Sequence, residues 1–383
     1  MTKPTPTLTA PSYRTSSAPA YQDVIAKDRR PAPPVVTEYS EIEIPVARVP
    51  RSRYTSKAYA DLEMERLWPR VWQMACREEQ IPEVGDIHVY EGPGASLLIV
   101  RAGDDDVRAY YNSCRHRGMK LCSDHTSVAK ISCPFHGFAW KLDGTLDYVP
   151  SRWDFPELEA AKMTLREVKV GRWGGFVFIN RDPDAQPLEK YLGKLIPHFK
   201  DWPMEDMYLA TIIRREMRAN WKVCWEGFVE AFHVPGVHAQ ALAFGGDSST
   251  QYDVWPDDEN VSRFLEATGI PGDQYPKMLT EQEILDASLR IVFPGAQTPA
   301  LDSDTSARQF MADAMRQQFS QMHSKDYSHL SDAEALDPMQ YSLFPNIVLF
   351  RSLGYPYAYR FIPVQGNHEA TYYDFMMFAP KPA

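Results

Sequence analysis

Two short motifs in the first half of the chain each pair a cysteine with a histidine. Cys114 and His116 stand in the segment NSCRHRG, and after sixteen intervening residues Cys133 and His136 stand in SCPFHG. Each motif places one thiolate and one imidazole on a tight loop. Two loops that present the same mixed pair can clamp a two-metal unit, with the thiolates on one metal and the imidazoles on the other.

Two kinds of centre use such a donor set. In a Rieske [2Fe–2S] cluster two histidines replace two cysteines on one iron, and neutral imidazoles raise the reduction potential to about −150 to +300 mV. A structural zinc site also takes two cysteines and two histidines, but its short motifs usually pair Cys with Cys and His with His. The mixed pairing favours the Rieske cluster. Gly118 and Gly137 follow the histidines, where a loop around a cluster needs a positive φ or a close backbone approach.

The remaining cysteines do not fit either motif. Cys122 lies between the motifs at the wrong spacing, and we expect it, Cys76 and Cys224 to be buried or half-buried thiols. His125, in the polar segment SDHTS, is expected to be a solvated loop residue. Disulfides are not expected, because no signal peptide and no membrane-spanning run is visible, which indicates a cytoplasmic protein whose thiols stay reduced.

A second constellation lies in the segment NWKVCWEGFVEAFHVPGVHAQ. In a helix Glu226, Glu230 and His233 would stand at i, i+4 and i+7 and so share one face. His238 would lie roughly 140° away on an unbroken helix, by the 3.6-residue period. Pro235–Gly236 can reverse the chain and bring His238 back beside His233.

Two imidazoles completed by one carboxylate form the facial triad of non-haem Fe(II) oxygenases, whose open face admits O₂ and substrate. Either glutamate could instead orient an imidazole through a hydrogen bond. Taken alone, the segment could also be a helix end with two ordinary histidines. The upstream cluster motif favours the iron site.

Length and charge limit the possible functions. A chain of 383 residues suits two domains. The formal net charge of −10 argues against nucleic acid or an anionic membrane as a partner. No signal peptide is visible, and no apolar run is long enough to span a bilayer, so we expect a cytoplasmic protein.

The pattern along the chain predicts five parts. Residues 1–45 are rich in Pro, Thr, Ser and Ala and are expected to form a mostly disordered arm. A leading helix is expected in 46–70 and a mostly β domain in 71–180. A linker with a helical piece follows in 181–206. The second domain, 207–383, should open with a strand and end in β-structure.

Within the second domain we expect a helix from about 219 to 232. Helical pieces are predicted near 279–291 and 306–322. The stretch from about 246 to 335 is treated as an insertion rich in Asp, Ser and Pro, either a lid over a pocket or a surface loop.

The two constellations together resemble the α subunits of Rieske non-haem iron aromatic-ring-hydroxylating oxygenases, over roughly residues 50–383. The resemblance implies an α+β chain, with an all-β Rieske domain followed by a helix-grip (START-like) antiparallel-sheet catalytic domain. It implies that Glu230 bridges His233 to the second cluster histidine of a neighbouring subunit, where the family more often has Asp. A homotrimer or an α3β3 assembly follows from that bridge. The implied metal ligands are Cys114, His116, Cys133 and His136 for the cluster, and His233 and His238 for the iron.

One feature departs from the family. Its third iron ligand is an Asp beyond the last strands of the catalytic domain, whereas here no carboxylate follows Asp374, which itself sits inside a strand-like run. We therefore expect the chain to lack its C-terminal part and the third ligand. Glu226 is a poor substitute, because its side chain starts two turns from His233.

The resemblance implies the terminal component of a multicomponent oxygenase, of the ring-hydroxylating kind. NAD(P)H electrons would arrive from a separate flavin reductase, directly or through a ferredoxin, since the chain has no G-x-G-x-x-G fingerprint. O₂-dependent mono- or dihydroxylation of an aromatic or other apolar organic substrate is the expected reaction. The alternatives are an incomplete electron-transfer or binding protein that lacks the third iron ligand, and a structural zinc protein. The sequence does not determine the substrate, the type of oxidation or the presence of a β subunit.

Overall fold

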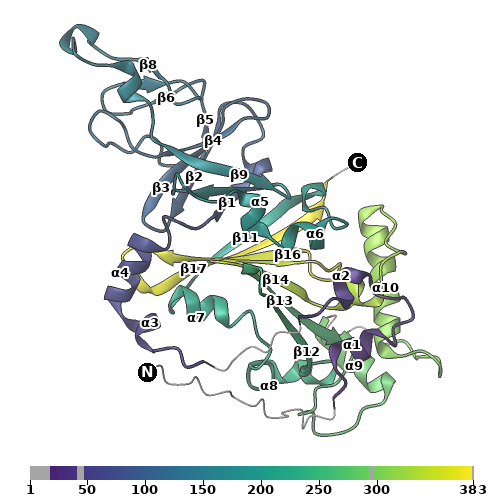
Figure 1. Ribbon diagram of the computed structural model, residues 1–383. Coiled ribbons are helices and arrows are strands. Elements are labelled where there is room, and N and C mark those ends of the chain that lie inside the picture. Colours follow the sequence, from purple (N-terminus) through teal and green to yellow (C-terminus); the bar gives the residue numbers. More distant parts are fainter. Residues whose placement is uncertain (1–17, 41–46, 293–294, 296, 382–383) are drawn as a thin grey trace.

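The computed structural model describes residues 18–40, 47–292, 295 and 297–381. A β-rich domain lies at one end of the molecule and a larger part built of strands and helices at the other (Figure 1). The α+β fold class predicted from the sequence, with a β domain ahead of an antiparallel-sheet domain, is confirmed.

The N-terminal domain is built on an antiparallel sheet in the order β1-β10-β9-β4-β3-β2-β5, with a small sheet β6-β7-β8 beyond it. Residues Leu97–Val100 of β3 are buried on both faces, because Leu98 and Val100 pack under the cysteine loops and Leu97 and Ile99 pack on the opposite side. The strands are β1 (Gln73–Arg77), β2 (Asp86–Gly92), β3 (Ala95–Arg101), β4 (Val107–Tyr111), β5 (Thr126–Ser127), β6 (Ile131–Ser132), β7 (Ala139–Trp140), β8 (Leu146–Tyr148), β9 (Glu167–Trp173) and β10 (Phe176–Asn180).

The catalytic part holds a second antiparallel sheet, in the order β11-β17-β16-β15-β14-β13-β12. Side chains point alternately to the two faces of this sheet along each strand. In β15, Leu349 faces the first domain and the linker, while Val348 and Phe350 face α7. The strands are β11 (Met207–Met217), β12 (Gly245–Trp255), β13 (Asp258–Thr268), β14 (Met339–Leu343), β15 (Ile347–Phe350), β16 (Tyr357–Val364) and β17 (Asn367–Pro380).

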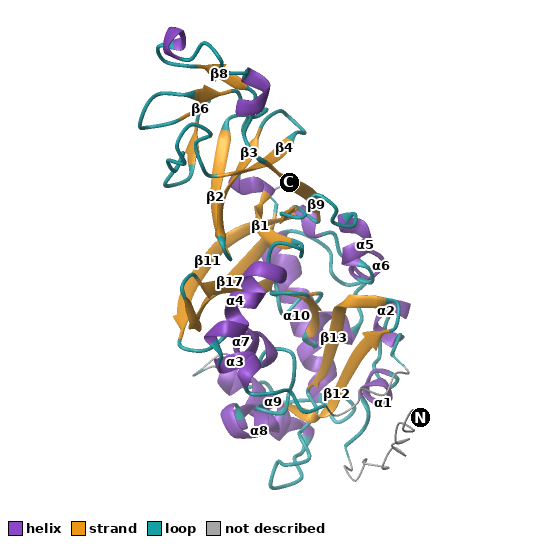
Figure 2. Ribbon diagram, turned by 60° about the vertical axis from the view of Figure 1, so that its left-hand side comes forward, coloured by secondary structure: helices purple, strands orange, loops and turns teal. Residues whose placement is uncertain are grey.

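Helices surround this sheet, with α7 and α8 on one side and α9 and α10 towards β12 and β13 (Figure 2). No helix in the described part of the chain combines the length and the apolar character needed to cross a membrane. The helices are α1 (Tyr21–Ile25), α2 (Pro34–Thr37), α3 (Ser52–Thr55), α4 (Lys57–Arg66), α5 (Leu188–Leu192), α6 (Leu195–Phe199), α7 (Trp221–Glu226), α8 (Val234–Val237), α9 (Glu281–Val292), α10 (Ala307–His323) and α11 (Asp332–Leu336); the 3₁₀ turns are η1 (Glu78–Gln80), η2 (Arg152–Asp154), η3 (Ala160–Met163), η4 (Met204–Asp206) and η5 (Ala239–Ala243).

The expectation of a disordered arm is wrong for residues 18–40; residues 1–17 and 41–46 lie outside the described part. Tyr21, Val24 and Ile25 of α1 are buried against β13. Their i, i+3, i+4 spacing gives even a five-residue helix one apolar face. The Tyr21 hydroxyl donates to Asp337 Oδ2 at 3.0 Å. A few apolar anchors therefore suffice to fix this segment in a polar, Pro-rich stretch.

The treatment of 246–335 as an insertion is also corrected, because its first part forms the long hairpin of β12 and β13. These strands contain buried polar side chains, and for that reason the sequence pattern did not indicate strands. Asp253 in β12 pairs with Arg263 in β13, with 2.8 Å between Oδ2 and Nη2, and both side chains are fully buried.

We predict that Arg308 fixes the N-terminal segment onto the catalytic domain. Its buried guanidinium pairs with Asp28 at 2.7 Å and with Asp337 at 2.6 Å. R308M leaves two buried carboxylates without their partner and should lower the free energy of unfolding by about 3–5 kcal/mol. The control is R29Q, which removes a surface ion pair of 3.9 Å and should cost less than about 1 kcal/mol. Equal urea midpoints for the two variants would contradict the assignment.

Candidate metal centres

The two cysteine loops have the same backbone conformation. In each loop the cysteine N–H donates to the carbonyl five residues later, and the N–H of the glycine four residues later donates back to the cysteine carbonyl, at distances of 2.7 to 3.0 Å. Gly118 and Gly137 both have φ of 77°, as the sequence predicts, and a side chain would be strained there. Cys114 and Cys133 thus occupy equivalent positions on matched loops.

The four donors separate into a sulfur pair and an imidazole pair. Cys114 and Cys133 are 4% and 3% exposed, and their thiols are within hydrogen-bonding reach of each other. Burial raises the pKa of Cys114. The pKa of Cys133 is lowered: burial opposes this, but the backbone N–H groups of His136 and Phe135 face its sulfur and outweigh it. The rings of His116 and His136 lie 5.0 Å apart.

This arrangement fits a two-iron cluster. His116 Nδ1 is buried and has no hydrogen-bond partner, which is costly for a ring nitrogen unless a ligand occupies it. A structural zinc ion would require all four donors to converge on one point. Two irons need two pairs of donors instead, and these loops present two pairs.

The other three cysteines lie where the sequence predicts. Cys76 and Cys224 are buried, Cys122 is half-buried, and all five thiols are free of disulfides. His125 differs from its expected role as a purely solvated residue. Its ring is exposed, but it stacks on His88 at 4.1 Å and accepts a hydrogen bond from the Val89 N–H.

The predicted helix from 219 to 232 is wrong beyond its first half. Asn220 caps α7, and the helix ends at Glu226. The Ala231 N–H donates to the Tyr252 hydroxyl, and the Phe228 carbonyl accepts from Gln340 Nε2. These bonds to the sheet replace the helical i→i−4 pattern. Glu226, Glu230 and His233 therefore do not share one helical face.

Glu230 and His233 nevertheless form a close pair. His233 Nδ1 donates to Glu230 Oε1 at 2.7 Å, and the His233 backbone N–H donates to Oε2 at 3.1 Å. This bond orients the imidazole and leaves Nε2 free for a metal. The half-exposed His233 ring and the His238 ring lie 5.2 Å apart.

The sequence analysis placed His238 correctly beside His233, but for the wrong reason. Pro235 does not reverse the chain. It stands in the first turn of α8, where a missing N–H is tolerated, and this short helical turn carries the chain from His233 to His238.

Among the described residues, no carboxylate joins the two histidines as a third metal ligand. Asp374 is fully buried and engaged by Arg214 at 2.6 Å and Arg360 at 2.8 Å. Glu226 accepts a hydrogen bond from the Tyr54 hydroxyl at 2.9 Å. Both acids are held by other partners.

Aromatic rings form a wall beside this segment. Phe228, five residues before His233, lies 4.9 Å from Tyr359 and 5.3 Å from Phe361 and Tyr373. The tyrosines of this wall were not among the site residues predicted from the sequence. The alternation in YPYAYR, which puts every second residue on one face of a strand, was the available signal.

Other apolar side chains near the two histidines in the sequence have different positions. Val234 and Leu242 belong to a small core with Phe264, and Val237 is 67% exposed. Phe244 lines an apolar cavity of about 290 Å³ against α9 and α10.

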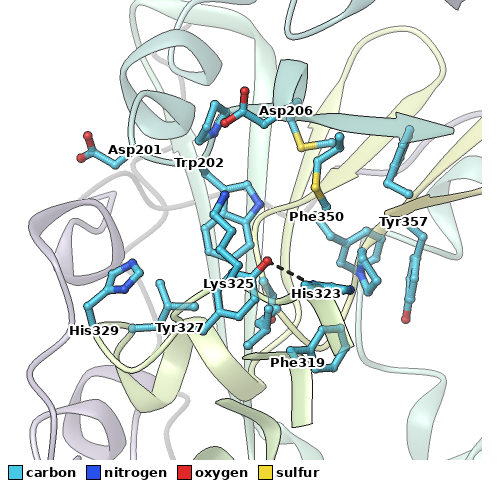
Figure 3. Close-up of a pocket in the computed structure, with 18 residues that line it drawn as sticks. Asp201, Trp202, Asp206, Phe319, His323, Lys325, Tyr327, His329, Phe350 and Tyr357 are labelled. Atoms are coloured by element: carbon cyan, nitrogen blue, oxygen red, sulfur yellow. Dashed lines mark hydrogen bonds between the residues drawn. The ribbon is translucent and has the colours of Figure 1, made fainter. Parts of the chain in front are cut away.

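A separate aromatic pocket lies between α10, the segment 201–207 and the ends of β15 and β16 (Figure 3). Trp202, Phe319 and Tyr357 line it, and the His323 ring is hydrogen-bonded to the Tyr327 hydroxyl at 3.1 Å. Its lining includes none of Glu230, His233 and His238, so this pocket is not the candidate iron site.

The protein-family model of the Rieske [2Fe-2S] domain matches residues 71–159, and that of the ring hydroxylating alpha subunit (catalytic domain) matches residues 198–383. The chain is 31% identical over 193 residues to the carnitine monooxygenase oxygenase subunit of Escherichia coli, covering 50% of this chain and 52% of the relative. It is 30% identical over 190 residues to the biphenyl 2,3-dioxygenase subunit alpha of Rhodococcus jostii, covering 48% and 41%. The matched region therefore spans about half the length of these relatives.

Solved structures share the fold. The quaternary ammonium Rieske monooxygenase CntA in complex with L-carnitine superposes with a TM-score of 0.62 at 18% identity, covering 87% of this chain and 76% of that one. Naphthalene 1,2-dioxygenase with indole bound gives 0.61 at 19% identity, covering 86% and 70%. With a [2Fe–2S] domain followed by a mononuclear-iron catalytic domain, the chain belongs to the Rieske oxygenase alpha subunits.

Proposed function

We propose that this chain is the terminal oxygenase component of a multicomponent Rieske oxygenase. The observation that carries the proposal is the presence of two separate donor sets on one chain: matched loops for a cluster, and an oriented histidine pair in the segment whose Phe228 belongs to the aromatic wall. The cluster supplies electrons one at a time, and the mononuclear iron binds O₂ beside the substrate.

The ligand assignments follow the geometry. Cys114 and Cys133 would hold one iron of the cluster, and His116 and His136 the other. His233 and His238 would supply two ligands to the mononuclear iron. Glu230 acts through His233 by accepting its Nδ1 proton, so it is a positioning residue.

The position of the two centres supports transfer between subunits. The cluster loops lie near β6 at one end of the molecule, and α8 with its flanking histidines lies at the other end (Figures 1 and 2). Electrons would pass from the cluster of one subunit to the iron of its neighbour, through His136 and Glu230, in a homotrimer or an α3β3 assembly. Exposed apolar side chains around the cluster, Met119, Phe135 and Trp153, suit such a contact.

The electron source must be another protein. Neither donor set accepts a hydride, and the sequence has no dinucleotide fingerprint. A flavin reductase, directly or through a ferredoxin, would deliver NAD(P)H electrons to the cluster.

The aromatic wall suits two classes of small organic substrate. An apolar ring can stack on Phe228 and its neighbours, as the biphenyl relative would suggest. A quaternary ammonium group can sit over the same faces, because electron-rich tyrosine rings attract a cation. The four tyrosines gathered around Phe350 and Phe228 favour the second class, and the carnitine and glycine betaine relatives agree with it.

A second candidate function is electron transfer without oxygenation. It is favoured by the lack, among the described residues, of a carboxylate that could serve with His233 and His238 as the third metal ligand. Substrate-dependent O₂ uptake separates the two functions, because only the oxygenase couples cluster oxidation to product formation.

We predict that the purified protein contains acid-labile sulfide and gives a low-g Rieske EPR signal after dithionite reduction. H116A removes one imidazole of the cluster and should abolish the signal. C122S is the matched control, because Cys122 lies between the motifs and holds no metal in this assignment, so its signal should persist. Zinc without labile sulfide would reject the cluster and the oxygenase together.

We predict that E230Q lowers substrate-dependent O₂ uptake at least tenfold while the EPR signal of the cluster is unchanged, because His233 loses its anionic partner. E230D, which keeps the charge, should recover part of the rate. E226Q makes the same change four residues earlier, where the partner is Tyr54, and should keep most of the activity. Equal losses in E226Q and E230Q would argue for a general structural effect.

We predict that F228L weakens binding of the preferred substrate, because it removes one aromatic face and keeps an apolar side chain. The substrate class is identified by titration with two sets of compounds. L-carnitine and glycine betaine represent quaternary ammonium substrates, and biphenyl and chlorobenzene represent apolar aromatic substrates. The expected loss is about tenfold or less, the size of one cation–π or stacking contact. F232L, on an exposed ring of the same segment, is the control. Unchanged substrate binding in F228L would show that the aromatic wall is not part of the substrate site.

A further inference from the structure

A cleft separates the Rieske domain from the catalytic sheet, away from both candidate metal centres. It lies between β2 on one side and β11, β16 and β17 on the other, and it has a volume of about 230 Å³. This is room for a few water molecules or one small ion. His88 and His125 line it from the Rieske domain, and Arg214 and Arg360 line it from the sheet.

The sheet side of the cleft has an excess of positive charge. Arg214 donates to Asp374 through Nε at 2.6 Å and Nη2 at 2.8 Å, and Arg360 donates to the same carboxylate at 2.8 Å. Two guanidinium groups thus share one carboxylate. The hydrogen bonds of Arg214 use Nε and Nη2, so its Nη1 has no partner among the described residues. The two guanidinium groups therefore carry one positive charge more than the carboxylate balances, and the Arg214 side chain is half-exposed.

The Rieske side presents an unpartnered imidazole. His88 is only 8% exposed, it lines the cleft, and its ring makes no hydrogen bond to any described residue. It stacks on His125 with 4.1 Å between ring centroids and 19° between ring planes. His125 Nδ1 accepts from the Val89 N–H at 3.0 Å, so in the neutral ring Nε2 carries the proton and is a donor.

The surroundings of His88 are cationic. Burial, the neighbouring His125 and the charges of Arg360 and Arg214 lower the pKa of His88 to about 3. Asp374 is already shared by the two arginines, and Glu91, the other acid at the cleft, pairs with Lys120 at 2.6 Å. At neutral pH His88 is therefore an uncharged donor beside an uncompensated cation.

We propose that this cleft binds a small oxyanion, of the phosphate or carboxylate type, between the two domains. The free edge of the Arg214 guanidinium would hold two oxygens, and imidazole N–H groups would donate to the others. Such an ion balances the excess charge and gives the His88 ring, which lines the cleft, a hydrogen-bond partner. Because it would contact both domains, its binding stabilises their arrangement. The site does not depend on the oxygenase proposal.

The test is calorimetric titration of the metal-loaded protein with sodium phosphate at pH 7, with sodium chloride at the same ionic strength as the blank. Wild-type protein should show saturable binding and a rise in its thermal midpoint that chloride does not reproduce. R214Q should bind at least tenfold more weakly. R215Q is the matched control: it removes the same charge from the next residue of β11, whose side chain points to the opposite face, and it should bind like wild type.

A second measurement does not rely on a variant. In wild-type protein with labelled histidines, the His88 resonance should move with phosphate at the occupancy that calorimetry gives. A parallel titration with acetate identifies the source: tighter phosphate binding indicates a free phosphate-type ion, and equal or tighter acetate binding indicates a carboxylate group. No saturable binding of either anion, a His88 resonance that does not move, or equal affinities in R214Q and R215Q would overturn the proposal.

Discussion

The arrangement of the two domains depends on one buried guanidinium. Arg360, in β16, donates to the backbone carbonyls of Met74 and Ala75 in β1 at 3.0 and 2.8 Å, and it pairs with Asp374 in β17. A buried charge is tolerated only when its donors are satisfied, so this residue fixes β1 against the catalytic sheet. If electrons pass between subunits, the angle between the domains determines whether a cluster reaches its neighbour's iron. Arg360 therefore constrains the path between the metal centres, although it touches neither.

The parts of the site that were predicted from sequence are those whose chemistry is local. Cys114 and His116 lie two residues apart on one loop, and Gly118 needs its positive φ for that loop to close. A spacing of this kind is a property of the loop itself and does not depend on the rest of the fold. Glu230 and His233 are likewise three residues apart, and their hydrogen bond forms although the helix predicted around them does not.

The features that the sequence analysis missed depend on partners far along the chain. Tyr21 and Asp337 are 316 residues apart, and their hydrogen bond contributes to the order of residues 18–40, which were expected to belong to a disordered arm. Asp253 and Arg263 make strands of a segment whose polar composition indicated a loop. His125 was expected to be solvated because its immediate neighbours are polar, but from its loop it stacks on His88 of β2. Composition and periodicity carry no information on such pairs.

The candidate iron site shows why its local and distant parts must be considered together. The backbone between α7 and α8 has left the helix, so the helical hydrogen bonds of α7 do not extend to His233. Two bonds from the sheet, through Tyr252 to the Ala231 N–H and through Gln340 to the Phe228 carbonyl, hold it instead. Each contributes about 0.5–1.5 kcal/mol, which is enough to select one conformation of a short segment. The same Phe228 carries the ring at the centre of the aromatic wall. One short stretch of irregular backbone therefore sets both the orientation of the histidine and the face available to a substrate, and a regular helix would not provide both.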